Sequence, residues 1–170
     1  TSTSGSGASY GGVGGKSYNN NLAPAVYGED QANFPYLLGS GGGNGDGGVG
    51  GKGGGAVTIK AAGTITNNGE ISSNGAVGTG GFSSWRPGGG SGGSIFLVAD
   101  DLAGSGNIWA KGGDAAGDAN FGSGGGGGGR ISVAYIKTQT FPLANFSTIG
   151  GVGSSSPTRD GLEGTVSIAK

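Results

Sequence analysis

The chain contains no cysteine, methionine or histidine. These absences exclude a disulfide framework, thiolate and imidazole metal sites, and any catalytic triad that depends on histidine. Charged residues make up only 11% of the sequence and the net charge is −1, so the basic surface of a nucleic-acid-binding protein is missing. No apolar run approaches the ~20 residues of a membrane-spanning helix. We therefore expect neither nucleic-acid binding nor membrane insertion.

Glycine is the dominant residue, with 47 of 170 positions, far above the usual ~7%. Glycine is costly to order, so a disordered linker is one interpretation. Six Phe, five Tyr, two Trp and clear apolar alternation argue against it. The chain begins at Thr1 without Met or a signal peptide, which suggests a processed or excised piece. Its few charges and many small polar residues predict a secreted or cell-surface location.

The stretch YGGVGGKS, residues 10–17, resembles a phosphate-binding loop at first sight. The Walker pattern requires glycine where Tyr10 stands, and it requires a buried strand before the loop and a helix after it. Neither is predicted here. The string GGVGGK also recurs 36 residues later, at 47–52. We therefore interpret it as a landmark of an internal repeat.

Four segments share a glycine run that opens into an alternating apolar pattern, with spacings of 38, 36 and 35 residues. Such alternation predicts strands with one buried face, and no stretch shows a helical stripe. Their leading strand residues are Val57, Ile95, Ile131 and Val166. The near-constant repeat length favours stacked coils over antiparallel hairpins. Glycine runs of this length can adopt polyproline-II-like conformations that pack closely side by side.

The predicted fold is thus all-β: a short parallel β-solenoid of about four ~36-residue repeats with glycine-rich, polyproline-II-like arms. We expect one repeat domain spanning residues 1–170. Its predicted parts are a divergent N-terminal cap or loop at 1–40, repeats at 41–78, 79–117 and 118–153, and a partial C-terminal repeat at 154–170.

Parts of the sequence resemble modules of bacterial surface proteins. GTITNNGEISSNG resembles a coil of filamentous-haemagglutinin-like β-helices, over about 13 residues. The blocks GGGSGGSIFLVADDLAGSGNIWAKGG and GGGGGGRISVAY are similar to glycine-rich repeats of large secreted bacterial proteins, and the glycine runs resemble polyglycine-II tip adhesins of phage tail fibres. The resemblance implies an architecture and a location, not an activity. Repeats near 36 residues exceed an ordinary β-helix rung, so the glycine arms are a necessary part of it.

Aromatic residues in loops form the predicted ligand site. Trp85 and Arg86 lie in GGFSSWRPGGG together with Phe82, and Phe121 occurs 39 residues after Phe82, near the same level of the repeat. Aromatic rings on rigid loops stack on sugar faces, whereas the alternative is that they only cover glycine-rich backbone. We expect a surface glycan or polysaccharide as partner, with self-association through the solenoid ends as a further possibility.

The sequence gives weaker evidence for a catalytic or metal-binding site than for the aromatic ligand site. The adjacent carboxylates Asp100 and Asp101 point to opposite faces of a strand, unlike a glycosidase pair, and turn chemistry is the expected role. Arg130 precedes a strand and is expected as an outward, solvated charge. No cofactor is predicted; calcium binding by Asp46, Asp114 and Asp118 in glycine loops stays open.

The sequence therefore predicts a non-catalytic extracellular module for adhesion or glycan binding. Two alternatives are a structural spacer or self-assembling filament subunit, and a polysaccharide-degrading β-helix enzyme. No threonine ladder is present, although glycine bundles leave ice binding open.

Overall fold

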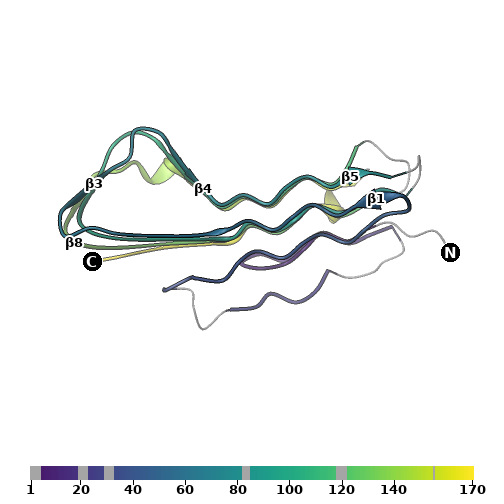
Figure 1. Cartoon of the computed structure of the whole chain (residues 1–170), viewed down its shortest axis with the longest axis horizontal. Helices are drawn as coiled ribbons and strands as arrows, with labels where there is room; N and C mark the ends of the chain where they lie inside the picture. The colour runs from purple at the N-terminus through teal and green to yellow at the C-terminus, as the bar shows by residue number, and fades with distance from the viewer. Residues whose placement is uncertain (1–4, 19–22, 29–32, 82–84, 118–121, 155) are drawn as a thin grey trace.

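The structure is a computed structural model that describes residues 5–18, 23–28, 33–81, 85–117, 122–154 and 156–170. It is long and flat, with strands toward one end and extended glycine segments toward the other (Figure 1). Successive passes of the chain superimpose in this view, so they are stacked along the viewing direction. Each pass runs out through a glycine segment into a strand and returns through a second layer.

A five-stranded sheet contains the strands that follow the glycine segments on the outgoing part of each pass. Its order is β10 (Thr165–Ala169), β8 (Arg130–Gln139), β6 (Ser94–Ala103) and β2 (Ala56–Lys60), and β3 (Thr64–Thr66) also pairs with β6. All these pairings are parallel. The four leading apolar residues of the repeat lie side by side: Val57 next to Ile95, Ile95 next to Ile131, and Ile131 next to Val166.

The return layer contains a three-stranded parallel sheet, in the order β4 (Glu70–Ser72), β7 (Asn107–Trp109) and β9 (Phe146–Ser147). Short 3₁₀ turns, η2 (Leu143–Asn145) and η3 (Pro157–Arg159), interrupt the later passes. The apolar core lies between the two parallel sheets. Its buried members come mainly from the middle passes: Ile95, Leu97, Leu102, Ile108, Ala110, Ile131, Val133 and Phe141.

The predicted fold class, a four-repeat all-β parallel solenoid, is wrong. The strands belong to several separate sheets, parallel and antiparallel, and the chain does not close into a solenoid. The antiparallel pair is β1 (Gly48–Val49) with β5 (Thr79–Gly80). The physical reason is that much of each pass consists of glycine. These segments lack the side chains that would wind a coil around a core, and they pack by their backbones instead.

The glycine segments bond to one another with a period of three residues. Within 88–93, successive N–H groups donate to three different neighbouring segments, and the sequence of neighbours then repeats. The acceptors are the carbonyls of Gly43, Gly124, Ala76, Ser40, Gly127 and Ser73, in that order. A chain with three residues per turn directs its N–H groups in this way. The segments are therefore bundled polyglycine-II-like helices.

These helices form three rows. The central row contains 51–55, 88–93, 124–129 and 159–164, and the return row contains 73–78, 110–116 and 148–154. The N-terminal row contains 39–43, 5–9 and 12–18, and it lies below the central row in Figure 1. Hydrogen bonds link each of the two inner segments, 88–93 and 124–129, to six surrounding segments. The inner segments are buried throughout.

Close approach of the backbones explains why these rows require glycine. A Cβ on Gly126 would lie 2.0 Å from the Gly90 carbonyl oxygen, and one on Gly125 would lie 2.0 Å from that of Gly151. By contrast, Gly55, Gly63 and Gly69 have no foreign atom within 4 Å of that position. A side chain at these glycine positions would therefore collide with a neighbouring backbone, and Ser91 is the one residue of 88–93 and 124–129 that is not glycine.

The two copies of GGVGGK occupy different rows and do not mark equivalent positions. Residues 12–18 pair with 122–128 in the antiparallel sense, whereas 51–54 pair with 88–91 in the parallel sense. The segment 33–38 lies against the outer face of the large sheet. There Asn33 and Leu37 accept hydrogen bonds from Ser132 and Ser94, and Phe34 packs edge-on against Phe96.

Candidate functional site

An aromatic and cationic cluster lies where several glycine segments end. Tyr18 ends the segment 12–18, Trp85 precedes the segment 88–93, and Arg159 closes η3. The Tyr18 and Trp85 rings meet edge to face, with centroids 6.2 Å apart at 80°. The Arg159 guanidinium carbon lies 5.7 Å from the Tyr18 ring centre, a cation–π arrangement. Tyr18 is 43% exposed, so part of the cluster faces solvent on a rigid support.

Arg86, predicted as a ligand-binding residue, bonds to its own loop. Its Nη1 donates to the carbonyl oxygens of Gly80 (3.3 Å) and Gly81 (3.2 Å). Both glycines have positive φ, 74° and 94°, a conformation that glycine adopts without strain. The Nε atom of Arg86 is buried and has no hydrogen-bond partner among the described residues. Arg86 therefore fixes the turn at Gly80 and Gly81, close in sequence to Trp85.

The structure brings together only part of the predicted site. Trp85 and Arg86 are adjacent, whereas Phe82 and Phe121 lie outside the described residues. Tyr18 and Arg159 join Trp85 from distant parts of the sequence, and the sequence analysis did not single them out. The row arrangement brings them together, and no local motif indicates it.

A buried polar cluster holds the N-terminal row onto the strands. Arg130 is only 3% exposed, so its expected role as an outward, solvated charge is wrong. Its Nη2 donates to the Tyr27 carbonyl (3.0 Å), and its guanidinium lies 5.3 Å from the Tyr10 ring centre. The Tyr10 hydroxyl lies 2.7 Å from Ser94 Oγ. Burial raises the pKa of the Tyr10 phenol, while the hydrogen bond to Ser94 and the charge of Arg130 oppose the rise.

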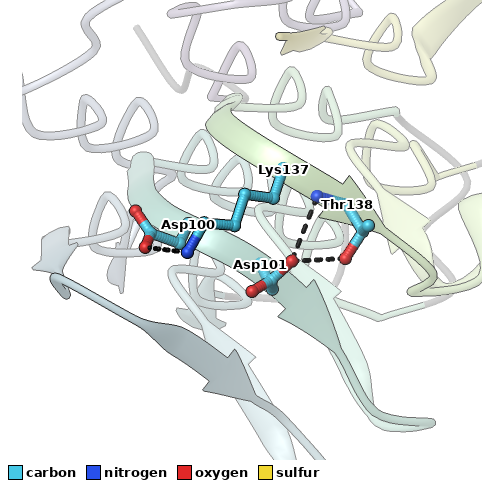
Figure 2. Close-up of polar contacts among 4 residues, drawn as sticks. All are labelled: Asp100, Asp101, Lys137 and Thr138. Carbon is cyan, nitrogen blue, oxygen red and sulfur yellow. Dashed lines mark hydrogen bonds and ion pairs between the residues drawn. The ribbon is translucent and has the colours of Figure 1, made fainter.

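The adjacent carboxylates do not form a catalytic pair, and they do not occupy a turn as expected. Asp100 and Asp101 lie inside β6, at a register irregularity with β8. Asp100 Oδ2 pairs with Lys137 Nζ at 2.8 Å, whereas Asp101 Oδ1 accepts bonds from the backbone N–H (3.1 Å) and hydroxyl of Thr138 (Figure 2). Hydrogen bonding to Asp100 raises the pKa of Lys137. Both carboxylates thus join consecutive passes of the chain.

The structure places two of the three candidate calcium ligands. Asp114 Oδ1 accepts a hydrogen bond from the Val152 N–H (2.7 Å), Asp46 lies in the exposed turn before β1, and Asp118 is outside the described residues. Within the part of the chain that the structure describes, no group of three or more acidic residues could hold a metal ion.

A groove of about 500 Å³ lies at the other end of the molecule. It runs between β10 and the β8–η2–β9 region and is mainly apolar. Its lining residues are Tyr135, Gln139, Leu143, Phe146, Val166 and Ile168. Tyrosine is the only ionisable type among them, so this groove has no carboxylate or cation for acid–base chemistry.

Comparison with known proteins gives no relative: no family model, curated protein or solved structure matches the chain. Among the described residues, no helix is long and apolar enough to cross a membrane.

Proposed function

We propose that this chain is a non-catalytic, extracellular adhesion module that binds a surface glycan or polysaccharide through Tyr18 and Trp85. The observation that carries the proposal is the Tyr18–Trp85–Arg159 cluster, part of which is exposed at the end of a bundled backbone scaffold. Binding residues commonly lie on loops that a rigid scaffold positions. The C–H face of a sugar packs on an aromatic ring, and arginine N–H groups donate to its hydroxyls.

Arg86 follows Trp85 in the sequence and bonds to the carbonyls of Gly80 and Gly81. These bonds tie the residue next to Trp85 to the turn after β5, which lowers the ordering entropy that binding at Trp85 costs. An aromatic pair at the end of the glycine segments suits repeated, weak contacts with a polymer, as adhesion requires. The location that follows is a cell surface or the extracellular medium.

A glycan-array screen tests the proposal, with the wild type beside Trp85→Ala and Tyr18→Ala. Each ring contributes about 1 kcal/mol of stacking, so either variant loses binding about five- to tenfold. Trp109→Ala is the matched control, because Trp109 lies in β7 with Lys111 Nζ 3.4 Å from its ring centre. A parallel screen with calcium tests whether the ion contributes.

Binding that survives both cluster substitutions, or that Trp109→Ala abolishes equally, would place the ligand elsewhere. If the wild type binds no glycan on the array, the glycan proposal is refuted. The structural spacer would then be the better candidate, since the bundled backbone favours stiffness.

A further inference from the structure

The glycine bundle has two open edges. Among the described residues, the central row has one segment more than the rows on either side of it, so 51–55 and 159–164 each have neighbours on one side only. Within the described part of the chain, the N–H groups of Lys52, Gly53, Gly55 and Glu163 have no hydrogen-bond partner. Lys52 and Gly55 are three residues apart, so both N–H groups point to the same, outward side.

The edge at the C-terminal end also exposes aliphatic side chains in both its glycine and its strand halves. In the glycine half, Gly161 and Gly164 donate to the carbonyls of Gly151 and Thr148, so these two segments form one continuous surface. The groove beside β10 continues this surface along the strands, and the whole surface, 143–154 with 159–169, is called the channel. Along the glycine half of the channel, exposed side chains come from both segments, 148–154 and 159–164. The exposed aliphatic residues of the channel are Leu143, Ile149, Val152, Leu162 and Val166. Exposed apolar patches of this kind mark interaction surfaces.

The opposite edge ends in a projecting ridge, residues 51–60. It consists of the glycine segment 51–55 and the edge strand β2, which pairs with β6 on one side only. Val57 and Ile59 in β2 are half-buried, because no further strand covers them. An unpaired strand edge is a template for another chain.

We propose that a second copy of this chain occupies the channel, with its ridge 51–60 lying against segments 143–154 and 159–169 of the first. The contact is head to tail: it uses a different surface on each copy. A heterologous contact that does not close on itself produces an open filament. The chain is then a self-assembling unit, a property separate from glycan binding at the Tyr18–Trp85 cluster.

Two observations favour a copy over an unrelated partner. First, two of the open N–H groups of the edge, those of Lys52 and Gly55, are three residues apart, and a second glycine bundle presents carbonyls at the same spacing. Second, the charges of the glycine half are complementary, whereas Lys60 in the strand half comes level with Ala169, next to Lys170. Through the strand register Val57 is level with Val166, which places Lys52 of the incoming ridge level with residue 161, between Asp160 and Glu163. Opposite charges favour this head-to-tail contact over a contact between like edges.

Sedimentation velocity over a concentration series, with electron microscopy at the highest concentration, tests the proposal. The wild type is expected to grow beyond its 16.0 kDa monomer into linear assemblies. Leu143→Glu combined with Val152→Glu places charges in the channel and is expected to remain monomeric. Both side chains are exposed, so the fold is retained, and circular dichroism checks this.

Ile136→Glu is the matched control. Ile136 is as exposed as Leu143, 66% in each case. It follows Tyr135, a groove residue, so it points to the opposite face of β8. This variant is expected to assemble like the wild type.

A mixing experiment tests the head-to-tail geometry. The channel variant keeps an intact ridge, so adding it to wild type is expected to cap assemblies and shorten them. If the wild type stays monomeric at every concentration, the proposal is wrong. Assembly that persists in the channel variant, or that this variant fails to cap, would overturn the proposed contact. Loss of glycan binding without loss of assembly affects only the proposed function.

Discussion

Gly126→Ala is the most direct test of the bundled backbone. Gly126 lies in the inner segment 124–129. A methyl group there would be 2.0 Å from the Gly90 carbonyl oxygen and 2.4 Å from its carbon. Ordinary contact begins near 3.4 Å, so segments 88–93 and 124–129 must separate by about 1 Å or more. Neither segment can move alone, because six others surround each of them.

The cost follows from the bonds that cross this contact. Two N–H groups of the first segment donate to carbonyls of the second: Gly89 to Gly124 and Gly92 to Gly127, each at 2.9 Å. A separation of this size breaks both, at about 1 kcal/mol each. Overpacking adds about 1–3 kcal/mol. The expected loss is about 3–5 kcal/mol, a large part of the ~5–15 kcal/mol by which domains are stable.

Urea unfolding, followed by tryptophan fluorescence, measures this loss. Gly55→Ala is the matched control, because its Cβ meets no atom within 4 Å and its φ lies outside the left-handed region. That substitution reduces the freedom of the unfolded chain and is expected to stabilise the protein by about 0.4–1 kcal/mol. Equal stabilities of the two variants would refute the argument that backbone contact holds the bundle.

Two further substitutions test the polar contacts. Because burial raises the pKa of Tyr10, the folded state retains the phenolic proton where the unfolded chain has lost it. The stability of the wild type is therefore expected to fall as the pH rises above about 10, and Tyr10→Phe to flatten that fall; an unchanged slope would contradict it. Asp101→Ala removes two bonds to Thr138 and is expected to lower the thermal midpoint, whereas Asp100→Ala removes only a surface pair with the 63%-exposed Lys137 and leaves it nearly unchanged. Equal effects of the two would show that the backbone contact of Asp101 is unimportant.

The strand region was the part most accessible from sequence. Apolar alternation at Val57, Ile95, Ile131 and Val166 identified strand residues that do lie side by side. Their side chains carry that information, because each must reach the same core. The fold class built on them was nevertheless wrong, since alternation describes single strands and not how the chain between them is arranged.

Glycine explains what the sequence could not reveal. A polyglycine helix has no side chain to specify a neighbour, and it bonds equally well to parallel and antiparallel partners: 88–91 pairs in parallel with 124–127 but antiparallel with 40–43. The identical GGVGGK copies consequently lie in different rows. The assembly of Tyr18, Trp85 and Arg159 depends on those rows, so this cluster was equally hidden.

The order of the bundle must therefore come from residues outside the glycine runs. The strands are one source, because the in-register apolar columns of β2, β6, β8 and β10 align the glycine segments that precede them. Serines are the other: Ser91 Oγ accepts the Ser40 N–H, and Ser154 Oγ accepts the Ser123 N–H, each at 2.8 Å. These hydroxyls link neighbouring helices and fix their register. Helices of glycine alone would be free to slide along one another. Replacing these serines with alanine keeps the side chains small but removes the bonds that set the register. The substitution therefore distinguishes the residues that let the bundle pack from those that specify its order.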